Sequence, residues 1–314
     1  MAAFFFQGKL QLMQRAAAWL MLAGLCAGTV PAALAQDAQA LRAKHDTLRA
    51  RLADNPFRRP MVLESTEGDD GVRGEVYAVV EQPFDRVAPA LEGTEHWCEL
   101  LILHLNVKRC SASGKAPGEV LALAVGRKFD QPIADAYKVD FRFALAASAA
   151  DYQRVSMSAQ NGPLGTRDYR LALEIVPLDA KRSFVHMSYA YAYGFAANMA
   201  MKSYLATAGR DKIGFSITGS GEGGKPVFVG GLRGVIERNS MRYYLAIEAY
   251  LGALTVPPAE QLEKRLRDWY AATERYPAQL HEMERDEYLM MKRSETRRQR
   301  AAVLSSAGAE RAPS

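Results

Sequence analysis

Residues 137–145 have the sequence YKVDFRFAL, and this stretch decides the fold class. Its apolar side chains stand at every second position and share one face of an extended strand, while Lys138, Asp140 and Arg142 take the opposite face. Such alternation is typical of an antiparallel sheet with one face on a core and the other toward water. We therefore expect an antiparallel sheet with an apolar face.

Neighbouring runs extend this sheet along the chain. Similar patterns predict strands near 74–81, 119–129, 151–160, 165–177 and 181–195. The turn sequences NGP at 161–163 and DAK at 179–181 separate the last three runs and suit short hairpin loops. Two further strands are expected at 212–218 and 227–229, on either side of a glycine-rich loop at 219–224.

Helical periodicity marks the other segments. Leu41, Leu48 and Leu52 predict an amphipathic helix over 37–53 that packs on the outside of the domain. An extended strap at 55–71 leads into the first strand, after which Pro83 begins a helix and a second helix follows at once. The remaining predicted helices are a short one near 196–207, a long one over 232–254, and a charged tail after 257 that projects from the domain or straps around it.

The order of these elements resembles a known fold. A strand, two consecutive helices, several antiparallel strands and a long final helix are similar to the helix-grip fold of the START and polyketide-cyclase-like (SRPBCC) superfamily. The resemblance is carried by the sequences GEVYA at 74–78, PF at 83–84 and WCE at 97–99, and by the helix at 232–254. It implies an α+β domain in which a curved antiparallel sheet wraps around the long C-terminal helix and leaves a cavity between them, with flanking helical extensions.

The first 35 residues predict export. Lys9 and Arg15 precede or begin an apolar run, and the sequence ALA at 33–35 has the small-x-small pattern of a signal peptidase site. We therefore expect cleavage near Ala35 and a periplasmic mature protein. The expected organisation is a signal peptide at 1–35, a helix and strap at 36–73, a START-like domain at 74–254 and a charged helical tail at 255–314.

Composition limits the partners of the mature chain. Two of the 40 Lys and Arg side chains lie in the leader, so 38 remain against 35 Asp and Glu, a formal charge of about +3. This balance argues against a dedicated nucleic-acid binder. Cys98 and Cys110 remain after cleavage, and in an oxidising compartment they are expected to form a disulfide, with two buried thiols as the alternative.

Candidate ligand-binding residues come from the last strand of the sheet and from the long helix. Tyr189 and Tyr191 share one face of the strand, and their rings with polar tips are suited to line a pocket, although a tyrosine row is also typical of an ordinary core. His186 lies on the other face, with a hydrogen-bonded core histidine as the alternative. The helix candidates are Tyr244, Glu248 and Leu251. A carboxylate in this apolar stripe must reach water, meet a cation or lose free energy through desolvation.

Motifs for nucleotides, metals and nucleophilic catalysis fail in their context. The segment GSGEGGK at 219–225 formally fits a phosphate loop, but Pro226 stands where that loop needs Ser or Thr and a β-type run follows. The five histidines are scattered, and neither a His-Glu-x-x-His frame nor a G-x-S-x-G elbow occurs. We therefore expect no catalytic residue, no metal and no cofactor.

One leading function and two alternatives follow. The leading hypothesis is non-catalytic periplasmic binding of a lipid or other apolar small molecule between the sheet and the long helix. The alternatives are a cyclase-like or hydrolase-like enzyme on the same fold, and a protein-interaction module whose cavity is filled by side chains. The tail is also a candidate for contact with anionic phospholipids, against the simpler alternative of a solvated helix end, through Lys292, Arg293, Arg297, Arg298 and Arg300.

Overall fold

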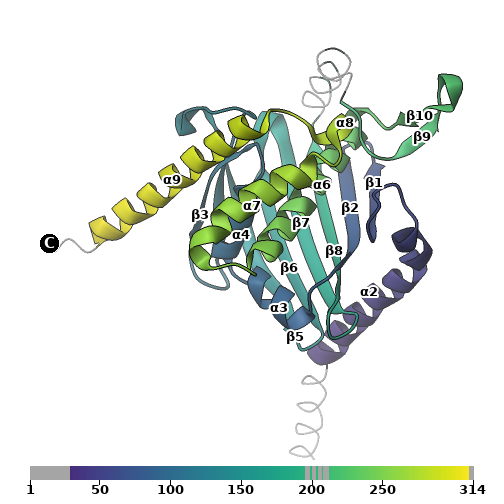
Figure 1. The fold of residues 1–314 in the computed structure, drawn as a ribbon. Helices are drawn as coiled ribbons and strands as arrows, with labels where there is room; N and C mark the ends of the chain where they lie inside the picture. Colours follow the sequence, from purple (N-terminus) through teal and green to yellow (C-terminus); the bar gives the residue numbers. More distant parts are fainter. Residues whose placement is uncertain (1–28, 195–198, 200–202, 204–206, 208–211, 311–314) are drawn as a thin grey trace, which may run out of the picture.

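A curved, eight-stranded antiparallel sheet forms the centre of the computed structural model, which describes residues 29–194, 199, 203, 207 and 212–310 (Figure 1). The strand order is β1-β2-β8-β7-β6-β5-β4-β3. The long helix α6 (Gly231–Ala253) packs against β1, β2 and β8 on the inner face. The predicted α+β helix-grip fold is confirmed. The strands are β1 (Met61–Glu67), β2 (Gly71–Val80), β3 (Val107–Ser113), β4 (Val120–Val125), β5 (Tyr137–Ala149), β6 (Tyr152–Asn161), β7 (Thr166–Pro177) and β8 (Ser183–Tyr193).

The outer face of the sheet is covered by α2 (Thr29–Ala53), at the lower right in Figure 1. Leu41, Leu48 and Leu52 are buried there together with Tyr77 and Phe184 of the sheet. The amphipathic helix predicted over 37–53 is therefore confirmed, and in the structure it begins earlier. Because α2 and α6 cover opposite faces, the central strands carry apolar residues on both faces.

Gly74 sets the distance between α6 and β2. A Cβ atom at this position would lie 2.3 Å from Ser240 Oγ and 3.2 Å from Ile236 Cγ1. Both neighbours belong to α6, so the bare backbone of Gly74 is what lets the helix approach the sheet. The small residue in the GEVYA sequence is thus a packing requirement.

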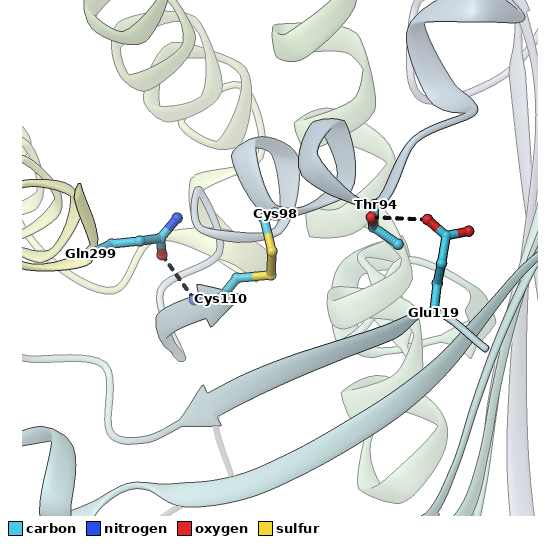
Figure 2. The surroundings of a disulfide bond; sticks show 5 residues. All are labelled: Thr94, Cys98, Cys110, Glu119 and Gln299. Carbon is cyan, nitrogen blue, oxygen red and sulfur yellow. Dashed lines mark hydrogen bonds between the residues drawn. A yellow bond between two sulfur atoms is a disulfide. The ribbon is translucent and has the colours of Figure 1, made fainter. Parts of the chain in front are cut away.

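One disulfide joins helix α4 (Thr94–Leu101) to the edge strand β3 (Figure 2). The Cα atoms of Cys98 and Cys110 are 5.2 Å apart, and the predicted bond is confirmed. The backbone N–H of Cys110 donates a hydrogen bond of 2.8 Å to Gln299 of α9 (Arg285–Glu310). The C-terminal helix α9, distant in the sequence, therefore meets α4 and β3 at this edge of the sheet.

The structure adds two edge strands to the prediction. Strand β1 lies within the segment 55–71, which was predicted as an extended strap, and pairs along its whole length with β2. Strand β3 was not predicted, because Lys108, Arg109 and its serines hide the alternation of the chain. Charged residues are common on edge strands, where they discourage pairing with other molecules.

Proline shortens the helix predicted from Pro83. The structure has a single turn, α3 (Phe84–Val87), followed by a 3-10 turn (Pro89–Leu91). Pro89 has no backbone N–H and its ring would clash with the preceding turn, so the α-helix cannot continue through it. Val87 and Leu91 are nevertheless both buried.

The glycine-rich segment forms a hairpin. Strands β9 (Ile217–Ser220) and β10 (Pro226–Phe228) pair in a separate two-stranded ribbon that extends away from the main sheet (Figure 1). The predicted hairpin loop is thus confirmed. The strand expected over 212–218 begins only at Ile217, because the N–H groups of Phe215 and Ser216 donate to the Glu237 carboxylate at 2.6 and 2.9 Å. Most of the helix predicted near 196–207 and most of the predicted signal peptide lie outside the described residues.

The charged tail is part of the core along much of its length. Helix α7 (Pro258–Thr273) packs on α6, the short α8 (Pro277–Leu280) follows, and α9 contacts β3 before it extends beyond the sheet (Figure 1). Trp269 and Tyr288 are buried and stack with ring centroids 5.0 Å apart. Among the described residues, no helix combines the length and the apolar character that a membrane span requires.

Lys292, one of the residues predicted to contact phospholipids, is buried in the structure. Its side chain is 0 % exposed, and its ammonium donates to Glu295 at 2.8 Å. Glu295 also pairs with Lys108 at 3.0 Å, so one carboxylate lies between two buried ammonium groups. An ammonium in this position cannot reach a lipid headgroup. Arg293 and Arg298 are exposed but paired, with Glu263 at 2.7 Å and Asp130 at 2.6 Å respectively.

Candidate functional site

Four tyrosines form a continuous group of rings between the inner face of the sheet and α6, which we call the tyrosine array. Tyr169 lies on β7, Tyr189 and Tyr191 on β8, and Tyr243 on α6. Ring centroids are 5.3 Å apart for Tyr169 and Tyr191, and 5.8 Å apart for Tyr189 and Tyr191. Tyr243 meets Tyr189 edge-on at 5.3 Å. These are favourable spacings for stacked and edge-to-face rings, so the array joins two strands to the helix.

The array is deep, yet two of its rings keep accessible surface. Tyr189 and Tyr191 are each 7 % exposed, whereas Tyr169 and Tyr243 are half-buried. Burial raises the pKa of all four phenols above its ordinary value. Their hydroxyls therefore stay protonated at physiological pH and can each donate and accept a hydrogen bond.

The end of β7 fixes the ring of Tyr169. Its hydroxyl lies 2.6 Å from Thr166 Oγ1. A Cβ atom at Gly162 would lie 2.2 Å from the same ring, so the glycine leaves the space that the ring fills. The pairing of β7 with β8 shifts register around Asp168, whose φ is 54°. This bulge interrupts the regular ladder directly before Tyr169.

His104 extends the array on the other side of Tyr243. The two rings stack with centroids 4.7 Å apart. Nδ1 of His104 accepts a hydrogen bond of 3.1 Å from the backbone N–H of Asn106, which places the ring proton on Nε2. Nε2 is buried and has no hydrogen-bond partner within the part of the chain that the structure describes. Burial, followed by the field of Arg242, holds the pKa of His104 well below 6.5, so the ring is neutral.

The predicted helix residues lie on another side of α6. Tyr244 is about 100° around the helix from Tyr243 and donates a hydrogen bond of 2.6 Å to Glu248. Glu248 also pairs with Arg59, so its carboxylate meets a cation, which is one of the three outcomes that the sequence allowed. Leu251 is fully buried in the core. The structure therefore does not bring these three residues together with Tyr189 and Tyr191.

His186 lies on the opposite face of the sheet, beneath α2. Its Nδ1 is 2.8 Å from Glu174 and its Nε2 is 3.4 Å from Glu75. The ring stacks on Tyr77 with centroids 4.3 Å apart. Burial lowers the pKa of His186, but the two carboxylates outweigh this effect and the pKa lies above 6.5. His186 thus belongs to a network that links β2, β7 and β8, and a ligand at the tyrosine array would not contact it.

Sequence reasoning missed three members of the site. Tyr169 alternates with Leu171 and Leu173, which are buried on the inner face, so the period of the strand was a usable signal. Tyr243 differs from the predicted Tyr244 by one position. His104 follows α4 in the chain, and its contact with α6 has no local signature. No cluster of three His, Cys, Asp or Glu side chains that could hold a metal ion occurs among the described residues.

Comparisons with known proteins give distant structural likenesses. No protein-family model matches the chain, and no curated protein matches it. Norcoclaurine synthase from Thalictrum flavum is similar at 15 % identity and a TM-score of 0.32, over 48 % of this chain and 88 % of that one. The Zhui aromatase/cyclase from Streptomyces sp. R1128 is similar at 13 % identity and a TM-score of 0.32, over 48 % and 86 % of the two chains.

A START superfamily protein from Mycobacterium smegmatis is also similar, at 13 % identity and a TM-score of 0.29, over 48 % of this chain and 95 % of that one. Scores this low say nothing about ligand or activity, and the fold is established by the strand order and by the position of α6. On those grounds the chain has the α+β helix-grip fold that START-like and polyketide-cyclase-like proteins share.

Proposed function

We propose that this chain is a non-catalytic binding protein for an apolar small molecule, which it holds at the tyrosine array. The observation that carries the proposal is the set of four rings from β7, β8 and α6, two of them only half-buried although they lie between the sheet and its helix. A core that only needed to be filled would be served by aliphatic side chains. Tyrosines add flat, rigid contact area and a hydroxyl that can orient a polar group of the ligand.

The nature of the rings narrows the ligand class. Tyr189 and Tyr191 form a largely buried apolar wall with protonated hydroxyls, a combination that suits a lipid or another largely apolar molecule with a few polar atoms. Such a ligand would contact Tyr169 and Tyr243, whose surfaces remain accessible. The predicted residues Tyr189 and Tyr191 stay in this proposal, while Tyr244, Glu248, Leu251 and His186 are left to structural roles.

The proposal places the mature protein in the periplasm. Its support is the leader sequence up to Ala35 together with the disulfide between Cys98 and Cys110, because such bonds persist in oxidising compartments. Two experiments test the periplasmic location and the bound ligand. N-terminal sequencing of the exported protein should begin at Gln36, and mass spectrometry of protein extracted from native periplasm should find a bound apolar molecule. Protein retained in the cytoplasm would contradict the location.

Titration with N-phenyl-1-naphthylamine, a neutral aromatic probe that fluoresces in apolar surroundings, tests the binding site. We expect saturable binding by the parent protein. Tyr191→Leu should weaken it by about threefold to tenfold, because a ring contact contributes about 0.5–1.5 kcal/mol beyond area burial. Tyr137→Leu is the matched control, since Tyr137 is a 49 % exposed tyrosine on β5. A parent protein without saturable binding, or equal losses in the two variants, would refute the site.

A further inference from the structure

A cluster of cations adjoins the His104 end of the tyrosine array. Arg242 and Lys212 each lie 2.9 Å from the carboxylate of Glu282, and Lys128 pairs with the same group. Three cations thus share one carboxylate, which leaves an excess of two positive charges. We call these four residues the cationic cluster.

The cluster reaches from the interior to the surface. The side chains of Arg242 and Glu282 are 2 % and 7 % exposed, whereas those of Lys128 and Lys212 are each 36 % exposed. The Nε of Arg242 is buried and makes no hydrogen bond within the described part of the chain. Burial and then the nearby Arg242 lower the pKa of Lys128 to about 8, so its ammonium is still mostly charged at pH 7 and the cluster keeps its excess of positive charge. An added anion would relieve this excess.

Short segments of chain join the cluster to the array, and the fields of Arg242 and Lys128 both act on His104. Arg242 precedes Tyr243 on α6, and Tyr243 stacks on His104. The side-chain amide of Asn106 donates a hydrogen bond of 2.6 Å to the carbonyl of Gly126, and the N–H of Gly126 returns one of 2.7 Å. This pair holds the segment that leads to Lys128 beside His104. The cationic cluster and the tyrosine array therefore meet at His104, whose Nε2–H has no acceptor in the described residues.

Among the described residues, the buried charges next to His104 add net positive charge. Lys292 donates a hydrogen bond of 2.7 Å to the His104 carbonyl, and it shares Glu295 with Lys108. These two ammonium groups and one carboxylate add a further positive charge on the protein side. An anion near His104 would therefore be attracted from two directions, and burial strengthens that attraction because water screens it less.

We propose that the ligand of the tyrosine array is an amphiphile whose anionic group, a carboxylate, sulfonate or phosphate, is bound by the cationic cluster. Lys128 and Lys212 face solvent and pair with the anion, Arg242 supplies the deeper charge, and His104 Nε2–H donates to an oxygen of the ligand. The apolar body of the ligand lies along Tyr243 and Tyr189. This inference rests on the proposed binding function and adds the chemical class of the ligand to it.

Two dyes that differ by one sulfonate test this inference. 8-Anilinonaphthalene-1-sulfonate has the same ring system as neutral N-phenyl-1-naphthylamine. We expect the parent protein to bind the sulfonate about tenfold more tightly, as one charge-assisted interaction implies. In the double variant Lys128→Met and Lys212→Met, the two dyes should bind with affinities within about twofold of each other, while binding of the neutral dye is unchanged.

The control is the double variant Lys138→Met and Lys225→Met, which removes two exposed lysines outside the cluster. It must keep the preference for the sulfonate. A parent protein that binds the neutral dye and shows no such preference, or a control that loses it equally, overturns the anionic class and leaves the apolar site intact. If the parent protein binds only the sulfonate dye, the apolar part of the ligand contributes too little and the proposal of an amphiphilic ligand is refuted. If it binds neither dye, both proposals are refuted.

Discussion

At the scale of single residues, Gly74 should be intolerant of a methyl group. Gly74→Ala would place Cβ 2.3 Å from Ser240 Oγ and push α6 off β2, at a cost of about 1–3 kcal/mol in unfolding free energy. Gly252→Ala is the matched control on α6, because its Cβ would have no neighbour within 4 Å. In that variant the helix should gain about 0.5–1 kcal/mol. Urea unfolding measures both changes in free energy. If the two variants changed stability in the same direction, the close packing of α6 on Gly74 would be contradicted.

His186 should make the stability of the fold depend on pH. Its pKa lies above the unfolded value of 6.5 because Glu174 and Glu75 outweigh the burial that alone would lower it. The folded state therefore binds the proton more tightly, so this contribution is complete below pH 6.5 and is lost as pH rises through the folded pKa. Unfolding free energy should fall as pH rises above 6.5 in the parent protein, and less steeply in His186→Asn. If the unfolding free energies of the two proteins change equally with pH, the pairing of His186 with Glu174 and Glu75 does not contribute to the pH dependence of stability.

Tyr243 shows how far sequence reasoning reaches at this scale. The alternation on β8 correctly placed Tyr189 and Tyr191 on the inner face, because a strand has only two faces. On a helix, an error of one residue rotates the side chain by about 100°, and Tyr243 rather than Tyr244 points to the array. The position of His104 depended on tertiary contact with α6, which periodicity does not contain.

At the scale of elements, the disulfide should stabilise the attachment of α4 to β3. Cys98 and Cys110 are separated by 12 residues, and closing a loop of this size is worth about 3 kcal/mol in the chain-entropy model. The double variant Cys98→Ala and Cys110→Ala should lose about that amount in urea unfolding. Titration of the denatured, unreduced mature protein should find no free thiol. Two free thiols would show that the bond does not form in the cell.

The elements differ in how clearly their sequences specify them. Strands β5 to β8 and helix α6 were predicted because their apolar residues repeat with one period over many positions. β1 and β3 lie at the edges of the sheet, where charged residues such as Glu64 on β1 and Arg109 on β3 interrupt the apolar pattern. The apolar repeat of each strand is therefore too short to predict it clearly. The break at Pro89 follows from the local chemistry of proline, and the path of Lys212 to Ser216 follows from a tertiary contact with Glu237. A count of apolar periodicity includes neither effect.

At the scale of the whole molecule, the C-terminal helices should be required for folding. A chain stopped at residue 257 lacks Trp269 and Tyr288, both buried, and exposes the face of α6 that α7 covers. We expect it to lose its cooperative thermal transition, whereas a chain stopped at residue 300 keeps it. Circular dichroism melting separates these outcomes. An intact transition in the shorter chain would show that the sheet and α6 fold without the tail.

The docking of α9 on β3 has a consequence for biosynthesis. Among the described elements α9 leaves the ribosome last, yet Glu295 supplies the carboxylate between two buried ammonium groups and Gln299 caps the N–H of a disulfide cysteine. Until α9 has been synthesised, Lys108 has no counterion at its native position and the edge of the sheet is incomplete. The nascent polypeptide therefore cannot complete this edge of the sheet until α9 has emerged, and a product terminated before α9 keeps an unfinished edge strand.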